Sequence, residues 1–132
     1  MPDEQITKLA LAVLQIKTDT VGYQAITQLP KLKTKFNPDI IIANAENAAS
    51  GYGLTKKIAN ELFNQGILIL TLGNHAWDQR EMLSYIEECP NIIRAINYPE
   101  GVPGKGDVKI TLDDGRTLLV IQVMLRLFMG IA

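Results

Sequence analysis

This sequence of 132 residues contains one cysteine and one histidine, and it has no large excess of either charge. Thirteen Lys and Arg residues against fourteen Asp and Glu residues leave a formal net charge of −1. A basic surface for duplex nucleic acid or for an anionic membrane is therefore not expected. The one cysteine, Cys89, excludes a disulfide framework within the chain and suits a reducing compartment.

Long apolar runs are missing as well. The run Leu9–Ile16 is far shorter than the ~20 apolar residues that a membrane-spanning helix needs. The chain begins with Met-Pro-Asp-Glu, which is acidic and unlike the basic start of a signal peptide. The composition is that of an ordinary globular protein, and no internal repeat or linker is visible. We therefore expect a single domain over residues 1–132, located in the cytoplasm.

Apolar runs alternate with segments of helical periodicity along the chain. Strands are expected at 9–16, 40–43, 67–71 and 92–96, and helices at 22–35, 55–66 and from 78 or 79 to 88. Pro30 predicts a break or kink in the first helix. Residues 108–112 and 117–123 flank an Asp-Asp-Gly-Arg turn and predict a hairpin. This order predicts an α/β fold: a mainly parallel sheet with flanking helices and a C-terminal β-hairpin.

Polar side chains gather where three of the expected parallel strands end. Asp19 follows the first strand, Glu46 and Asn47 follow the second, and Asn74 and His75 follow the third. The carboxyl ends of parallel strands form one edge of a sheet, where ligands bind. Carboxylate, amide and imidazole groups together are typical ligands of divalent metal ions, and a bridging carboxylate can join two ions.

Each of these residues also has a purely structural interpretation. Asn44, which directly ends the second strand, is more typical of a turn than of a ligand. Asp19 can be a helix cap, and a lone histidine is most often a structural residue. Trp77 is more typical of packing than of stacking on a substrate. The coincidence of three polar clusters at three strand ends favours a site.

Three motifs carry a resemblance to a known family. They are NAENAASGYGLT (44–55), TLGNHAWD (71–78) and INYPEGVPGKG (96–106). In this order and spacing they resemble the YmdB-like metallophosphoesterases, a branch of the calcineurin-like phosphoesterases, from about Thr18 to about Met129. The resemblance implies the first half of the family's αββα sandwich. It also implies a dinuclear centre of Fe or Mn, with Zn or Mg as alternatives, that hydrolyses phosphodiesters such as 2′,3′-cyclic nucleotides.

The same resemblance implies roles for individual residues. Asp19 matches the first metal-binding aspartate, Glu46 the bridging carboxylate, and Asn47 and Asn74 the amide ligands. His75 matches the histidine that protonates the leaving oxygen. The family's further histidine ligands lie beyond the segment matched here, so we expect a metal-dependent phosphodiesterase whose activity is impaired in this short chain.

Two alternatives to an active phosphodiesterase remain. One is a non-catalytic remnant of that fold that self-associates as a homo-oligomer, because Leu118–Leu125 is interrupted only by Gln122 and such a strand needs cover on both faces. The other is a serine esterase, which the absence of a serine after the first strand disfavours. A small phosphodiester or cyclic nucleotide is the expected substrate of the enzyme, with no membrane and no duplex nucleic acid as partner.

Overall fold

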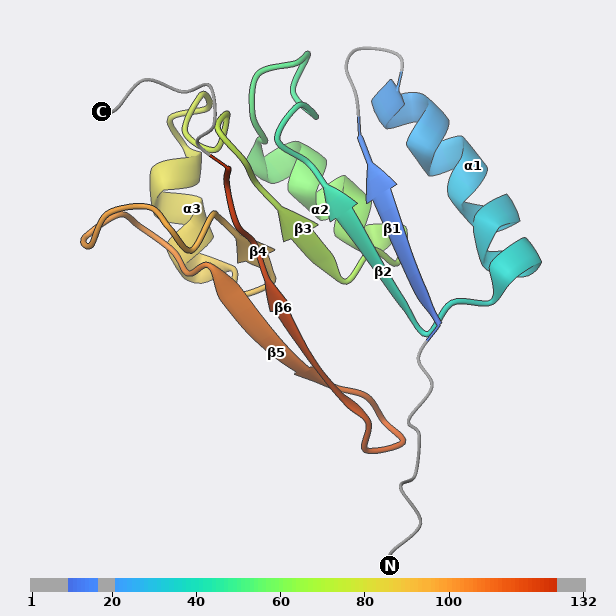
Figure 1. Cartoon of the computed structure of the whole chain (residues 1–132). Coiled ribbons are helices and arrows are strands. Elements are labelled where there is room, and N and C mark those ends of the chain that lie inside the picture. Colours follow the sequence, from blue (N-terminus) through green and yellow to red (C-terminus); the bar gives the residue numbers. More distant parts are fainter. Residues whose placement is uncertain (1–9, 17–20, 126–132) are drawn as a thin grey trace, which may run out of the picture.

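The computed structural model describes residues 10–16 and 21–125, and for Ala12, Gln15 and residues 21–27 it describes the backbone alone. Four parallel strands form one sheet in the order β1-β2-β3-β4: β1 (Leu11–Gln15), β2 (Ile40–Asn44), β3 (Ile69–Thr71) and β4 (Ile92–Ile93). The helices are α1 (Val21–Phe36), α2 (Lys56–Asn64) and α3 (Met82–Glu88). The strands β5 (Asp107–Thr111) and β6 (Thr117–Ile121) pair as an antiparallel hairpin. The predicted α/β fold with a C-terminal hairpin is confirmed (Figure 1).

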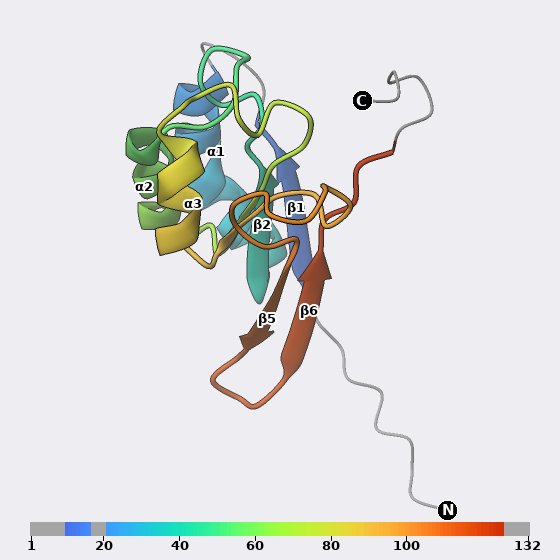
Figure 2. The same cartoon turned by 90° about the vertical axis from the view of Figure 1, so that its left-hand side faces the viewer.

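The parallel sheet is covered on its two faces by different elements. Alternate side chains such as Ile41 and Leu70 pack with buried residues of α1, α2 and α3. The residues between them, including Ile42 and Ile69, pack against Val108 and other side chains of the hairpin. Figure 2 shows the three helices together on one side of the sheet. Cover on both faces explains why these strands are continuous apolar runs in the sequence.

The hairpin is attached to the sheet by an ion-pair cluster at its turn. The guanidinium of Arg116 contacts the Asp39 carboxylate through two nitrogens, each at 3.0 Å, and lies 2.7 Å from Asp114. Asp39 stands directly before β2, and its Oδ2 also accepts a hydrogen bond from the Ala10 amide beside β1. The starts of two parallel strands and the hairpin turn are thereby joined.

A second arginine organises the loop that precedes the hairpin. The Arg94 side chain donates hydrogen bonds to the backbone carbonyls of Ala95, Val102, Pro103 and Gly104, at 3.0–3.3 Å. Its own amide donates to Lys105. The loop at 99–106 is therefore ordered by one half-buried side chain, in place of regular backbone pairing.

Two helix boundaries differ from the sequence expectation. The sequence predicted a break or a kink at Pro30, and the helix α1 continues through this residue without a break. The cost of ~3 kcal/mol for an interior proline is offset because Leu29 and Leu32 pack against the core. The third helix begins at Met82 and not at Asp78 or Gln79, because the preceding residues form single turns with bonds such as that from the Asp78 amide to the His75 carbonyl.

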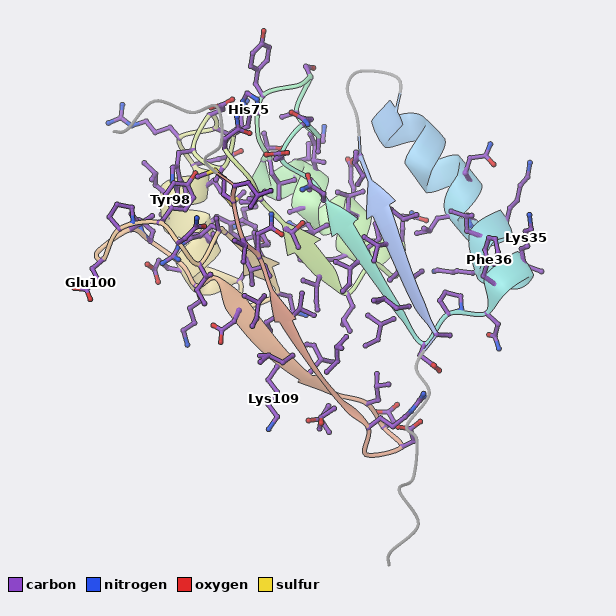
Figure 3. The ribbon with its side chains drawn as sticks, viewed as in Figure 1. Lys35, Phe36, His75, Tyr98, Glu100 and Lys109 are labelled. Carbon is purple, nitrogen blue, oxygen red and sulfur yellow. The ribbon has the colours of Figure 1, made fainter. Side chains whose placement is uncertain are left out.

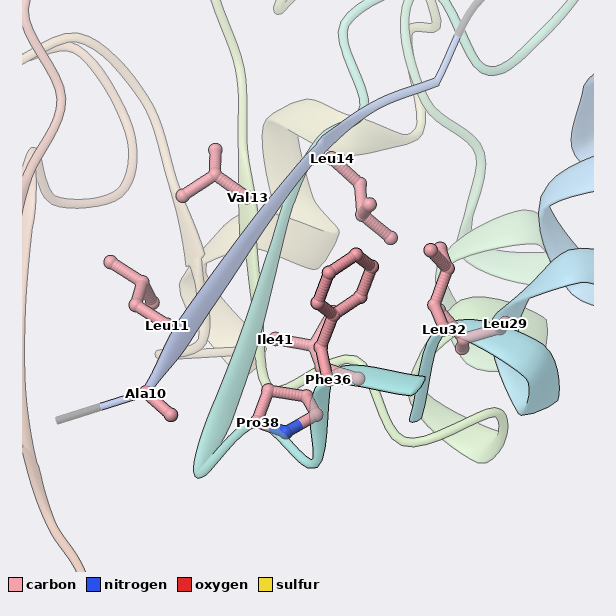
Figure 4. Close-up of a pocket in the computed structure, with 9 residues that line it drawn as sticks. All are labelled: Ala10, Leu11, Val13, Leu14, Leu29, Leu32, Phe36, Pro38 and Ile41. Carbon is pink, nitrogen blue, oxygen red and sulfur yellow. The ribbon is translucent and has the colours of Figure 1, made fainter. Parts of the chain in front are cut away.

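One edge of the sheet has no partner strand among the described residues. There β1 pairs with β2 alone, and on the hairpin side Leu11 and Val13 are 45% and 67% exposed. An apolar groove of about 430 Å³ lies between this edge and the end of α1, where Phe36 lines it (Figure 4). No helix within residues 10–16 and 21–125 is both long and apolar enough to cross a bilayer.

The Arg116 cluster predicts a specific loss of stability in acid. Hydrogen bonds from Arg116 hold the pKa values of Asp39 and Asp114 below the ordinary value of 3.8. A carboxyl whose pKa is lower in the folded state stabilises the fold above 3.8, and this contribution disappears as the pH falls through the lowered pKa. We expect Arg116→Met to lower the melting temperature at neutral pH and to flatten its decline in acid.

Thermal melts followed by circular dichroism from neutral pH to about pH 2.5 test this expectation. Arg80→Met, an exposed arginine outside the cluster, is the matched control. Parallel acid profiles for the wild type and Arg116→Met would contradict it.

Candidate active site

The loops that follow β2 and β3 lie together at the carboxyl edge of the sheet. Hydrogen bonds continue past the strand ends, from the Ala45 amide to the Thr71 carbonyl and from the Leu72 amide to the Ile93 carbonyl, both at 2.9 Å. The chain leaves the sheet only after these bonds, so residues 46–55 and 73–81 begin side by side. His75 projects at this end of the molecule (Figure 3).

Glu46 is the first ionisable residue after β2, and its backbone is fixed at two points. Its amide donates to the Oδ1 atom of Asn44 at 3.2 Å, and its carbonyl accepts from the Gly53 amide at 2.6 Å. The first bond closes an Asx turn, so the prediction that Asn44 serves as a turn residue is confirmed. The direction of the Glu46 side chain follows from this turn.

The Glu46 carboxylate lies against Gly73, at the start of the second loop. A β-carbon at Gly73 would stand 2.0 Å from the Oε2 atom of Glu46, so this position needs a glycine for space. The Oε2 atom is buried and has no hydrogen-bond partner in the described part of the chain. Because a buried oxygen without a partner costs ~1–3 kcal/mol, it indicates a place for a cation, a proton or a water molecule.

The loop that carries Glu46 is held in a tight conformation. Ser50, Gly51 and Gly53 all have positive φ angles, of 51°, 85° and 78°. The Gln79 side chain donates to the Tyr52 carbonyl at 2.7 Å, and a β-carbon at Gly53 would stand 2.8 Å from the His75 carbonyl oxygen. The two loops therefore pack directly on each other, and glycine is required at Gly53 both for its φ angle and for this approach.

The imidazole of His75 is oriented by a carboxylate on the same loop. Its Nδ1 atom lies 2.6 Å from the Oδ2 atom of Asp78, and the two side chains are 38% and 33% exposed. Because Asp78 engages Nδ1, the Nε2 atom is the ring nitrogen that can exchange a proton with a bound molecule. The pair has the arrangement of a general acid with its orienting carboxylate.

Contacts of two aromatic side chains, Tyr98 and Trp77, hold the second loop in place. The Tyr98 hydroxyl donates to the Gly73 carbonyl at 3.2 Å, and the rings of Tyr98 and Trp77 lie 6.0 Å apart at 54°. Trp77 also packs against the buried core. The prediction that Trp77 is a packing residue is confirmed.

The residues predicted for the site differ in their position and in their exposure. Glu46 lies against the loop of Asn74 and His75, Asn47 is half-buried beside Glu46, and Asn74 is exposed. Asp19 lies outside the described residues. Within residues 10–16 and 21–125, no three His, Cys, Asp or Glu side chains are close enough to hold a metal ion.

Sequence reasoning missed Asp78, Gln79 and Tyr98. Only Asp78 had a visible signal, since it lies three residues after the one histidine, and such a spacing lets two side chains meet within a turn. The contacts of Gln79 and Tyr98 join distant segments, and no local pattern marks them.

Comparisons with known proteins identify the family of this chain. The YmdB-like protein family matches residues 18–132. The chain is 46% identical over 101 residues to a 2′,3′-cyclic-nucleotide 2′-phosphodiesterase of Bacillus subtilis, and this match covers 76% of the chain and 38% of that relative.

Solved structures give the same result at the level of the fold. A hypothetical protein from Thermus thermophilus superposes with a TM-score of 0.82 at 34% identity, over 92% of this chain and 47% of that protein. A phosphatase from Mycoplasma pneumoniae superposes with a TM-score of 0.76 at 20% identity, over 89% of this chain and 43% of that protein, which shows a shared fold. The chain thus spans less than half the length of these relatives. On the match over residues 18–132, it belongs to the YmdB-like protein family.

Proposed function

We propose that this chain carries part of the active site of a metal-dependent phosphoesterase that hydrolyses 2′,3′-cyclic nucleotides or related phosphodiesters. The Bacillus subtilis relative is named for that activity. The observation that carries the proposal is the buried Oε2 atom of Glu46, which has no protein partner and lies against the loop of His75. A buried oxygen without a partner lowers the stability of the fold, so a role in binding or catalysis explains its presence better than a structural role.

The residues at the carboxyl edge of the sheet supply some of the ligands that a metal ion needs. Glu46 supplies a carboxylate oxygen directed toward the loop of Asn74, and amide oxygens of Asn47 and Asn74 are acceptable ligands for Mn²⁺ or Fe²⁺. The described part of the chain holds no complete set of ligands. A bound ion at Glu46 would polarise the phosphoryl group and the attacking water.

His75 is the proposed general acid. When water attacks the phosphorus of a cyclic phosphodiester, the bond to one ribose oxygen breaks and that oxygen needs a proton. The Nε2 atom of a protonated His75 donates it, and the ring is left neutral. The attacking water keeps one proton as the new hydroxyl on phosphorus and releases the other to the solvent. The Asp78 carboxylate, 2.6 Å from Nδ1, holds the ring in place and balances the positive charge of the protonated form.

The second candidate function is a non-catalytic module that self-associates. The exposed apolar residues of β6 favour it. Elemental analysis separates the two candidates, because only the enzyme needs metal at Glu46. We propose that catalysis by the isolated chain is weak, since the described ligands are too few to hold two ions firmly.

The first test of this proposal is metal binding. We expect the purified chain, reconstituted with Mn²⁺ or Fe²⁺, to bind at most one ion weakly. Glu46→Ala should abolish this binding, while Glu61→Ala, on the exposed surface of α2, should not change it. Elemental analysis and titration calorimetry supply the measurements. Two tightly bound ions would contradict the proposal that the ligand set is incomplete.

A second test uses the space at Gly73. In Gly73→Ala the new methyl group would displace the Glu46 carboxylate, which is the flexible end of its side chain. We expect the variant to fold with a melting temperature within a few degrees of the wild type and to lose Mn²⁺ affinity by about tenfold or more. Lys57→Ala, on the exposed surface of α2, is the control. Unchanged Mn²⁺ affinity would show that the carboxylate position does not matter.

A third test is hydrolysis of bis-p-nitrophenyl phosphate and 2′,3′-cyclic AMP in the presence of Mn²⁺. We expect slow turnover that falls about 100-fold in His75→Ala, the lower end of the range for a general acid, and less in Asp78→Asn. Asp113→Asn, in the exposed hairpin turn, should leave the rate unchanged. A rate that is insensitive to His75→Ala would remove this residue from the mechanism.

A further inference from the structure

The carbonyl oxygen of Gly73 is one point at which the candidate site is attached to the rest of the protein. It accepts a hydrogen bond from the Ala76 amide, which closes the turn that holds Asn74 and His75, and a second from the Tyr98 hydroxyl, both at 3.2 Å. A carbonyl oxygen has two lone pairs, so these two donors satisfy it. The first bond is local, whereas the second comes from a residue 25 positions later in the chain.

Gly73 also lies between two of the groups proposed to bind a metal ion. Its α-carbon lies against the Glu46 carboxylate, since a β-carbon there would stand 2.0 Å from the Oε2 atom. Its carbonyl belongs to the peptide group that leads directly into Asn74. Because a peptide group is planar, a hydrogen bond that fixes this carbonyl also fixes the direction in which the backbone enters Asn74. The Tyr98 hydroxyl therefore acts on the position of Asn74 relative to Glu46.

Tyr98 is itself held by contacts outside the two site loops. The side chain of the preceding residue, Asn97, donates through Nδ2 to the Met124 carbonyl at 2.6 Å and accepts at Oδ1 from the Met124 amide at 3.0 Å. Met124 follows β6, which runs toward the same end of the molecule as β2 (Figures 1 and 2). The hydroxyl of Tyr98 thus reaches Gly73 from a segment that is anchored to the hairpin.

We propose that Tyr98 is a positioning residue for the metal site: its hydroxyl holds the Gly73 carbonyl so that Glu46 and Asn74 converge on one ion. The inference rests on the proposed function, because the ion is the one proposed there. Ligands that converge from two loops must be held to within about 0.5 Å of the binding geometry. Residues that orient metal ligands change metal affinity by about 10–100-fold when they are lost. A purely structural hydrogen bond would change stability alone.

The test removes one oxygen atom and keeps the aromatic ring. We expect Tyr98→Phe to fold as the wild type does and to weaken Mn²⁺ binding by about tenfold, measured by titration calorimetry on the full chain. Tyr85→Phe is the matched control, because the Tyr85 hydroxyl donates a comparable bond, at 2.9 Å, to the Oδ1 atom of Asn60, 25 residues away. The control should show a similar melting temperature and the Mn²⁺ affinity of the wild type.

A second measurement follows the loop after β3 without metal. Trp77 is the one tryptophan of the sequence, and its ring lies 6.0 Å from that of Tyr98, so its fluorescence reports on this loop. Quenching by acrylamide in the metal-free chain should increase in Tyr98→Phe and not in Tyr85→Phe. Asn97→Ala removes the two bonds to Met124 and should change quenching and Mn²⁺ affinity in the same direction. This variant takes the place of Tyr98→Phe if the latter fails to fold by circular dichroism.

The outcomes separate this inference from the proposed function. Wild-type binding of Mn²⁺ that Tyr98→Phe leaves unchanged would overturn the inference and leave the proposed metal site in place. Equal losses of affinity in Tyr98→Phe and Tyr85→Phe would also overturn it, since they would indicate general destabilisation. A wild type that binds no Mn²⁺ would overturn the proposed metal site, and the inference with it.

Discussion

The parallel pairing of β2 with β3 is the constraint on which the candidate site depends. It aligns Asn44 with Thr71, so both strands end at one level and both following loops begin there. Glu46 and Gly73 each lie two residues beyond this pair, and their contact follows from the register. A slip of one residue would turn the Glu46 side chain to the other face of the sheet. The buried isoleucines of β2 hold the register because they would lose their cover in any other alignment.

The candidate site lowers the stability of the fold. The Oε2 atom of Glu46 is buried without a partner, and a replacement of Glu46 by an apolar residue would remove that cost. The surrounding core supplies the stability that tolerates it, since Leu70, Leu72 and Ala76 are fully buried around the start of the loop. Backbone strain in the same loop as Glu46, where Ser50 adopts a φ of 51°, is a second local cost. The unpaired oxygen and the strained backbone both lie where catalysis is proposed. This is expected where the position of a catalytic group matters more than local stability.

Much of the fold could be predicted because its signals are local. The apolar run 40–43 and the Asp-Asp-Gly-Arg turn each have a local physical cause, and each occurs as expected. The site was predicted from the order of strand ends, which required only the rule for parallel sheets. The loop contacts could not be predicted this way. No local pattern marks the role of Gly73, which is to leave space for a carboxylate 27 residues earlier in the chain. The four carbonyls that Arg94 holds are equally invisible to periodicity.

The candidate site and the C-terminal hairpin belong to different sheets, yet the described contacts join them. The loops of Glu46 and His75 lie at the carboxyl edge of the parallel sheet, whereas β5 and β6 form a separate two-stranded sheet (Figure 1). The two sheets are connected by buried side chains, by the Arg116 cluster and by backbone hydrogen bonds such as that from the Ile96 amide to the Gln122 carbonyl, at 2.8 Å. Asn97 exchanges two hydrogen bonds with the backbone of Met124, and the next residue, Tyr98, donates to the Gly73 carbonyl in the loop of His75. The position of the His75 loop therefore depends on the hairpin as well as on the parallel sheet.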